Sequence, residues 1–158
     1  MAANEVVRCF ASMTEPELRQ WVEANPGRVN DRDRFGHTPF NAAVYRRKSV
    51  PLILWLVKEK GADVNAEIAN SCYRLACAET VDIVNALLDC GTDPNLMPSF
   101  CPATALTWHV GRRNVEVVAR LLQDPRVRDT INIQPWGGKT ALYTACMVVA
   151  KPDAADVI

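Results

Sequence analysis

The chain has 158 residues, and its 18 basic and 18 acidic side chains give a formal net charge of zero. With 49% hydrophobic and 23% charged residues, it has the composition of a globular protein that can bury one substantial core. Balanced charge argues against a global field that recruits nucleic acid or an anionic membrane. The amino end lacks a signal-peptide pattern, and no apolar run approaches the roughly 18 residues of a membrane span.

The first segment, residues 1–32, is expected to be an amino-terminal capping unit. Thr14 stands ahead of Glu15-Pro16-Glu17. A capping hydroxyl followed by a proline and acids is typical of the first turn of a helix. Leu18 and Val22 then recur at helical spacing on one face. Such a segment can close one end of a stack of helix pairs, because one side of it must face water.

A complete helix-turn-helix unit is expected over residues 33–66. Gly36 supplies the permissive backbone of a turn. Thr38 caps a short helix that Pro39 opens, and Gly61 ends a second, more hydrophobic helix. Residues 33–66 contain both helices and both turns, so the later segments are compared with them.

Three further segments depart from the reference unit in different ways. Residues 67–96 keep both helices but lack the turn glycine, which makes the unit degenerate. Residues 97–134 end in a long connection, from Gln123 to Asp129, instead of a short turn. Residues 135–158 begin with a clear turn but stop soon after the first helix. We therefore expect a truncated last unit with an uncovered apolar stripe, and a chain that is the amino-terminal piece of a longer protein.

The units share one period, which is seen in the triplets that open their first helices. These triplets are Thr38-Pro39-Phe40, Ser71-Cys72-Tyr73, Thr104-Ala105-Leu106 and Thr140-Ala141-Leu142. A recurrence near 33 residues with such a core is typical of a stacked helix-turn-helix solenoid. These residues resemble the ankyrin repeat. The resemblance implies an all-α solenoid with projecting β-turn or hairpin loops, a single domain over residues 1–158, and a non-catalytic protein–protein interaction module.

The resemblance also implies where a partner protein binds. In ankyrin proteins the projecting turns and the exposed side of each first helix line a concave face that holds the partner. Aromatic and arginine side chains on such a face are the usual anchors of an interface. Transferred residue by residue, the candidate protein-binding residues are Arg34, Phe35, His37, Tyr45, Arg46, Phe100, Arg112, Trp136 and Lys139.

Other functions stay open at this point. The chain is compatible with a targeting or regulatory region of a larger multidomain enzyme whose catalytic part lies beyond Ile158. The basic clusters Arg46-Arg47-Lys48 and Arg112-Arg113, with Trp108 nearby, are also compatible with an RNA- or nucleotide-binding surface. The zero net charge favours a solvated loop instead. Self-association through the carboxyl-terminal end is a further possibility.

No catalytic, cofactor or metal site is expected. The segment Gly137-Gly138-Lys139-Thr140 is not a phosphate-binding loop, because Ile133 stands where its first glycine belongs. His37 is expected to face solvent in a turn and His109 to pack in the core; neither has a nucleophile motif or a zinc-ligand spacing. The six cysteines contain no C-x-x-C, so we expect reduced thiols and a cytoplasmic or nuclear protein.

Overall fold

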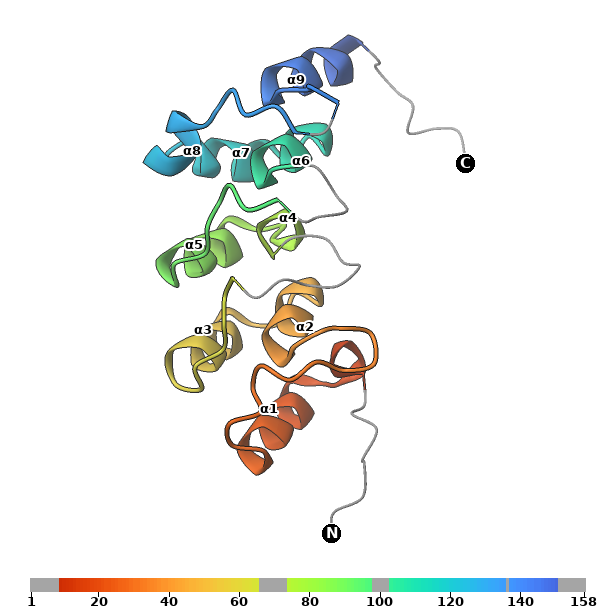
Figure 1. Ribbon diagram of the computed structural model, residues 1–158, viewed down its shortest axis with the longest axis vertical. Coiled ribbons are helices and arrows are strands. Elements are labelled where there is room, and N and C mark those ends of the chain that lie inside the picture. Colours follow the sequence, from red (N-terminus) through yellow and green to blue (C-terminus); the bar gives the residue numbers. More distant parts are fainter. Residues whose placement is uncertain (1–8, 66–73, 98–102, 136, 151–158) are drawn as a thin grey trace. The chain divides into compact units, whose positions relative to one another are not determined.

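The computed structural model describes residues 9–65, 74–97, 103–135 and 137–150 (Figure 1). All the regular secondary structure in these ranges is helical, so the expected all-α class is confirmed. By their internal contacts the residues form two compact units, Met1–Asp93 and Pro94–Ile158. The boundary between the units falls close to the start of the third predicted repeat.

The first unit opens with a capped helix. A single 3-10 turn, Phe10–Ser12, precedes helix α1, Glu15–Ala24. The Thr14 side chain accepts a hydrogen bond from the backbone N–H of Glu17, and the Glu17 carboxylate accepts the N–H of Thr14 at 2.8 Å. This reciprocal capping box satisfies backbone donors that the helix itself cannot use. The helix start predicted at Thr14 is therefore confirmed.

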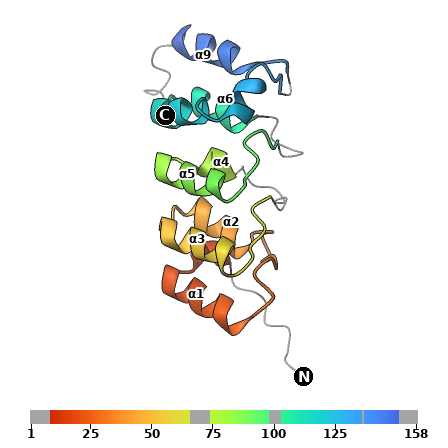
Figure 2. The ribbon, with the colours of Figure 1, turned by 90° about the vertical axis from the view of Figure 1, so that its left-hand side faces the viewer.

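Two helix pairs follow in the first unit (Figures 1 and 2). Within each pair the two helices pack against each other; between the pairs, first helix contacts first helix and second contacts second. The side chains of Ala42 and Ala43 are completely buried, which lets neighbouring helices approach closely. The helices are α2 (Pro39–Tyr45), α3 (Val50–Lys58), α4 (Arg74–Cys77) and α5 (Val81–Asp89).

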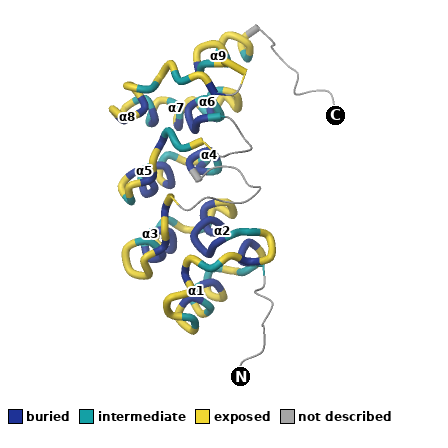
Figure 3. The backbone as a smooth tube through the Cα atoms, in the orientation of Figure 1, coloured by how far each residue is buried: buried dark blue, intermediate teal, exposed yellow. Residues whose placement is uncertain are grey.

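The core of the first unit lies between these helices, whose outward sides are exposed (Figure 3). It is built from large apolar side chains that recur at helical spacing, as the sequence predicts. Those without any exposed surface include Phe40, Leu52, Leu56, Val84 and Leu87.

The second unit has four helices among its described residues. Helix α6 packs against α7 and also against α9. The Thr104 side chain caps α6, and the Asn114 side chain caps α7. The helices are α6 (Ala105–Gly111), α7 (Val115–Leu121), α8 (Pro125–Asp129) and α9 (Ala141–Ala150).

Helix α9 leaves apolar side chains uncovered, as the sequence predicts. Leu142 and Val149 are 73% and 78% exposed. Residues 151–158 lie outside the described residues. Self-association through this surface stays a prediction.

The connection predicted from Gln123 to Asp129 is wrong, because its second part is helix α8. The Asp124 side chain caps this helix by accepting the N–H of Arg126 at 2.9 Å, and Pro125 takes the first helical position. Proline fits there because its fixed φ suits a helix and its missing N–H would have no partner. The Asp-Pro pair was the local signal for this helix.

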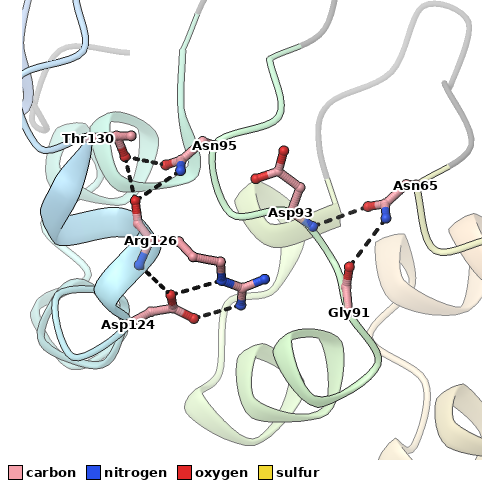
Figure 4. Close-up of polar contacts among 7 residues, drawn as sticks. All are labelled: Asn65, Gly91, Asp93, Asn95, Asp124, Arg126 and Thr130. Atoms are coloured by element: carbon pink, nitrogen blue, oxygen red, sulfur yellow. Dashed lines mark hydrogen bonds and ion pairs between the residues drawn. The ribbon is translucent and has the colours of Figure 1, made fainter.

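Asparagine side chains join successive turns inside each unit. The Asn65 amide donates to the Gly91 carbonyl at 3.2 Å, while its oxygen accepts the N–H of Asp93 at 3.1 Å (Figure 4). Asn30 joins the preceding pair of turns in the same way, through Gly61 and Asp63.

The second unit has its own version of this link. The Asn95 amide donates to the Arg126 carbonyl at 3.0 Å, and its oxygen accepts the Thr130 hydroxyl at 2.8 Å (Figure 4). Arg126 lies in the first turn of helix α8, and Thr130 is the residue that caps its end. The inserted helix thus keeps the link that a shorter turn makes elsewhere.

Candidate functional site

The turn ahead of α2 is built around the buried carboxylate of Asp33. Main-chain bonds of 2.9 Å, from Gly36 to Asp33 and from Asp33 to His37, close the turn. One carboxylate oxygen of Asp33 accepts the N–H groups of Phe35 and His37 at 2.9 and 3.0 Å. The other accepts the N–H of Phe10 at 2.9 Å. All five bonds involve Asp33, and four of them join it to other residues of the same turn, so this one buried residue orders the turn.

Five side chains on this turn and the end of α2 form a continuous cation–aromatic row: Arg34, Phe35, His37, Tyr45 and Arg46. The Arg34 guanidinium lies over the Phe35 ring, 4.7 Å from its centroid. The Phe35 and His37 rings are 6.5 Å apart, and the His37 and Tyr45 rings stack at 6.1 Å. The Arg46 guanidinium lies 5.8 Å from the centre of the Tyr45 ring. The structure thus brings together five of the nine predicted site residues.

The two outer rings of the row are the exposed ones. Phe35 and Tyr45 are 50% and 51% exposed, which is high for large aromatic residues. The expectation that His37 faces solvent is wrong, since its side chain is only 16% exposed. Its Nδ1 is buried, 3.7 Å from the Asp33 carboxylate, and has no hydrogen-bond partner. The His37 ring therefore lies between the exposed rings of Phe35 and Tyr45 and separates them.

The row presents positive charge to the outside. Arg34 has no hydrogen bond or ion pair with any residue that the structure describes. Arg46 donates its Nε–H to the main-chain carbonyl of Ala11 at 2.8 Å, which leaves its two terminal NH₂ groups available. The next residue, Arg47, forms an ion pair with Glu79 instead. The two cations at the ends of the row therefore have no carboxylate partner among the described residues.

The remaining predicted site residues belong to the second unit. Arg112 lies over the Trp108 ring, 5.7 Å from its centroid, and Lys139 is exposed in the turn ahead of α9. Phe100 and Trp136 lie outside the described residues. A binding role for all nine stays a prediction.

Two arginines in the basic clusters have an uncommon backbone conformation that sequence reasoning did not anticipate. Arg47 and Arg113, which stand 66 positions apart, have φ values of 51° and 57°. Each stands two residues after the last residue of a first helix, directly after the C-cap residue, a position that favours glycine. Arg47 reaches Glu79 ahead of α5, and Arg113 donates to the Val148 carbonyl of α9 at 3.0 Å. These side chains link neighbouring helix pairs and are not free cations.

The described residues contain no group of three or more His, Cys, Asp or Glu side chains that could hold a metal ion. His109 is 99% buried in α6, in keeping with a packing role. Among the described cysteines, Cys9, Cys90 and Cys146 are free thiols. Across the described helices, none is long and apolar enough to cross a membrane.

A family model described as ankyrin repeats, three copies, matches residues 73–157, more than half of the chain. The chain belongs to the ankyrin-repeat family. Ankyrin repeats are generally protein–protein interaction modules and are typically non-catalytic. The cation–aromatic row precedes the matched range, on a helix pair built like the ankyrin pairs that follow it. No curated protein matches the sequence.

Proposed function

We propose that this ankyrin-repeat protein is a non-catalytic module that binds a partner protein through its projecting turns and first helices, with the cation–aromatic row as the principal contact. The observation that supports the proposal is the row itself. Two half-exposed aromatic rings, Phe35 and Tyr45, stand on one surface with an arginine beside each. Tyrosine and arginine are among the residues that contribute most binding energy when a partner covers them.

The rigidity of the turn favours binding. Association costs roughly 0.5–1.5 kcal/mol for each mobile side chain that a partner immobilises. Here Asp33 fixes the backbone at Phe35 and His37, and Arg46 is tied to the Ala11 carbonyl. Part of this ordering cost is therefore met before the partner arrives. In the second unit Arg112 and Lys139 would contribute in a secondary role, together with Phe100 and Trp136.

A reducing compartment fits this assignment. Cys9, Cys90 and Cys146 are free thiols, which suits the cytoplasm or the nucleus. Burial raises the pKa of the Cys90 thiol. At neutral pH this thiol therefore stays protonated, which is its less reactive form. We therefore place the module and its partner in the same intracellular setting.

The test is to identify the partner by affinity capture and mass spectrometry and then to measure its affinity for variants by calorimetry. Phe35→Ala and Tyr45→Ala should each weaken binding by at least about 1 kcal/mol without unfolding the protein. Val115→Ala is the control, because Val115 is 74% exposed and lies on α7, a second helix outside the proposed surface. If Tyr45→Ala and Val115→Ala reduce the affinity equally, the row is not the principal contact.

A further inference from the structure

We infer that the cation–aromatic row recognises an acidic segment of the partner protein, one that carries carboxylates on both sides of an apolar side chain. This inference rests on the proposed function, since it names the class of partner for the same surface. Arg34 and Arg46 mark the two ends of the row, and Phe35, His37 and Tyr45 lie between them. The row thus has a positive charge at each end and aromatic rings between the two charges.

Neither arginine at the ends of the row has a carboxylate partner among the residues that the structure describes. The nearest acid in the sequence, Asp33, has its carboxylate buried and accepts three backbone N–H groups. Glu79 is already paired with Arg47. A partner that brings carboxylates therefore supplies what this surface lacks, whereas a basic partner would meet two like charges.

The geometry of the two arginines suits carboxylates in particular. Arg46 uses its Nε–H on the Ala11 carbonyl and is held over Tyr45, so its terminal NH₂ groups remain to form a pair of parallel bonds. Arg34 has all its N–H groups available and is held over Phe35. Paired N–H···O bonds between a guanidinium and a carboxylate are short and strong, and an ordered arginine loses less entropy in forming them.

Single-stranded RNA is the other anionic ligand with aromatic contacts, but the row suits it less well. Bases bind such platforms by stacking on open ring faces. Here each exposed ring already has a guanidinium over it, and Tyr45 also stacks on His37. The uncovered parts of Phe35 and Tyr45 suit contact with an apolar side chain better than a stacked base.

The test uses the full chain, labelled with ¹⁵N, and four synthetic probes followed by NMR. Three are 12-residue peptides with one Leu-Tyr centre, identical except that the flanking positions are Glu, Lys or Gln; the fourth is a 12-nucleotide oligouridylate. We expect the Glu peptide to shift the amides of residues 34–37, 45 and 46, with an affinity about tenfold above that of the Gln peptide. The affinity should fall as the salt concentration rises, because the exposed ion pairs are screened.

Two variants and a matched control complete the test. Arg34→Gln and Arg46→Gln should each lower the affinity for the Glu peptide about fivefold or more. Arg34→Gln removes no hydrogen bond, so it reports on binding even if Arg46→Gln loosens the contact with Ala11. Arg128→Gln, at an exposed arginine of α8, should leave the affinity unchanged.

The contrary outcomes separate this inference from the proposed function. Equal or tighter binding of the Lys or Gln peptide at the row would overturn the acidic segment but leave the row as a protein contact. Shifts at the row with oligouridylate and not with the Glu peptide would make it an RNA surface. Absence of any shift at the row with the Glu peptide also overturns the inference. A different result would contradict the proposed function: the captured partner would bind the Tyr45→Ala variant as tightly as the unchanged protein.

Discussion

The buried carboxylate of Asp33 accepts the backbone N–H of Phe10, 23 residues earlier in the chain, at 2.9 Å. Its second oxygen holds the N–H groups of Phe35 and His37. One residue thus fastens the 3-10 turn at the start of the described chain and also shapes the turn that carries the cation–aromatic row. The order of the row therefore depends on a side chain that is itself buried.

Replacement of Asp33 should destabilise the first unit strongly. Asp33→Ala leaves three backbone donors without their acceptor, and the loss of a charged acceptor costs about 1.5–3 kcal/mol for each buried bond. We expect a fall of at least about 3 kcal/mol in the free energy of unfolding, measured by urea denaturation. Asp129→Ala, at an exposed acid of α8, should change it by less than about 0.5 kcal/mol. Similar values for the two variants would mean that the Asp33 bonds add little.

The asparagine links make a second, smaller contribution. Asn65→Ala removes two hydrogen bonds, to Gly91 and Asp93, and should lower the free energy of unfolding by about 1–2 kcal/mol. Asn132→Ala is the natural comparison, because Asn132 is exposed in a turn and makes no recorded side-chain bond among the described residues. Equal unfolding midpoints for both variants in urea would contradict a stabilising link.

Because Arg47 has a left-handed backbone conformation, its replacement by glycine should destabilise the protein less than its replacement by alanine. Glycine adopts a φ of 51° without strain, whereas alanine does not. Arg47→Gly and Arg47→Ala both remove the exposed ion pair with Glu79, so this loss cancels in the comparison. The glycine variant should be more stable than the alanine variant by about 1 kcal/mol, the reverse of the usual order. A more stable alanine variant would show that the conformation relaxes at no cost.

Asp124 predicts a specific loss of stability in acid. The hydrogen bond from the Arg126 side chain, supported by its backbone N–H and charge, lowers the pKa of the Asp124 carboxyl. The unfolded chain then binds the proton more readily than the folded one. The stabilising effect is therefore complete above the ordinary pKa of an aspartate, about 3.9, and is lost as the pH falls through the lower pKa of the folded state.

The measurement for Asp124 is the melting temperature as a function of pH. Asp124→Asn keeps a capping oxygen for α8 but removes the charge, so its melting temperature should fall less steeply below about pH 4 than that of the unchanged protein. Glu116→Gln, at an exposed acid of α7, is the control. Parallel curves for the unchanged protein and Asp124→Asn would rule out this contribution.

Helix starts could be predicted from sequence because their signals are local. The side chains of Thr14, Thr38 and Thr104 each accept a backbone N–H from the residue three positions later, and the sequence predicts a helix start at each of them. Helix α8 has the same kind of signal in Asp124 and Pro125, but the charged residues around it resemble a loop. The resemblance to ankyrin repeats identified the five residues of the row as candidates, but the contacts among their side chains could not be predicted from it. Ring distances depend on how α2 packs against the turn, which no local pattern encodes.

The role of Asp33 was not predicted either. Its bond to Phe10 spans 23 residues and has no signature in the spacing. Two of its three bonds, to residues two and four positions later, are the short-range contacts that an aspartate before a turn often makes. The bonds to Phe35 and His37 could have been predicted from the sequence, whereas the buried bond to Phe10 could not.

The links made by Asn30 and Asn65 have one further consequence. Each asparagine contacts only main-chain atoms of the next turn: a carbonyl at Gly61 or Gly91, and an N–H at Asp63 or Asp93. Such a joint uses no side-chain atom of the turn that it contacts. Exposed side chains between the joints, such as Arg34 and Phe35, can therefore be exchanged while the buried Asp33 and the main-chain bonds keep the spacing of the repeats. A new binding preference can thus be engineered into the turns without rebuilding the scaffold beneath them.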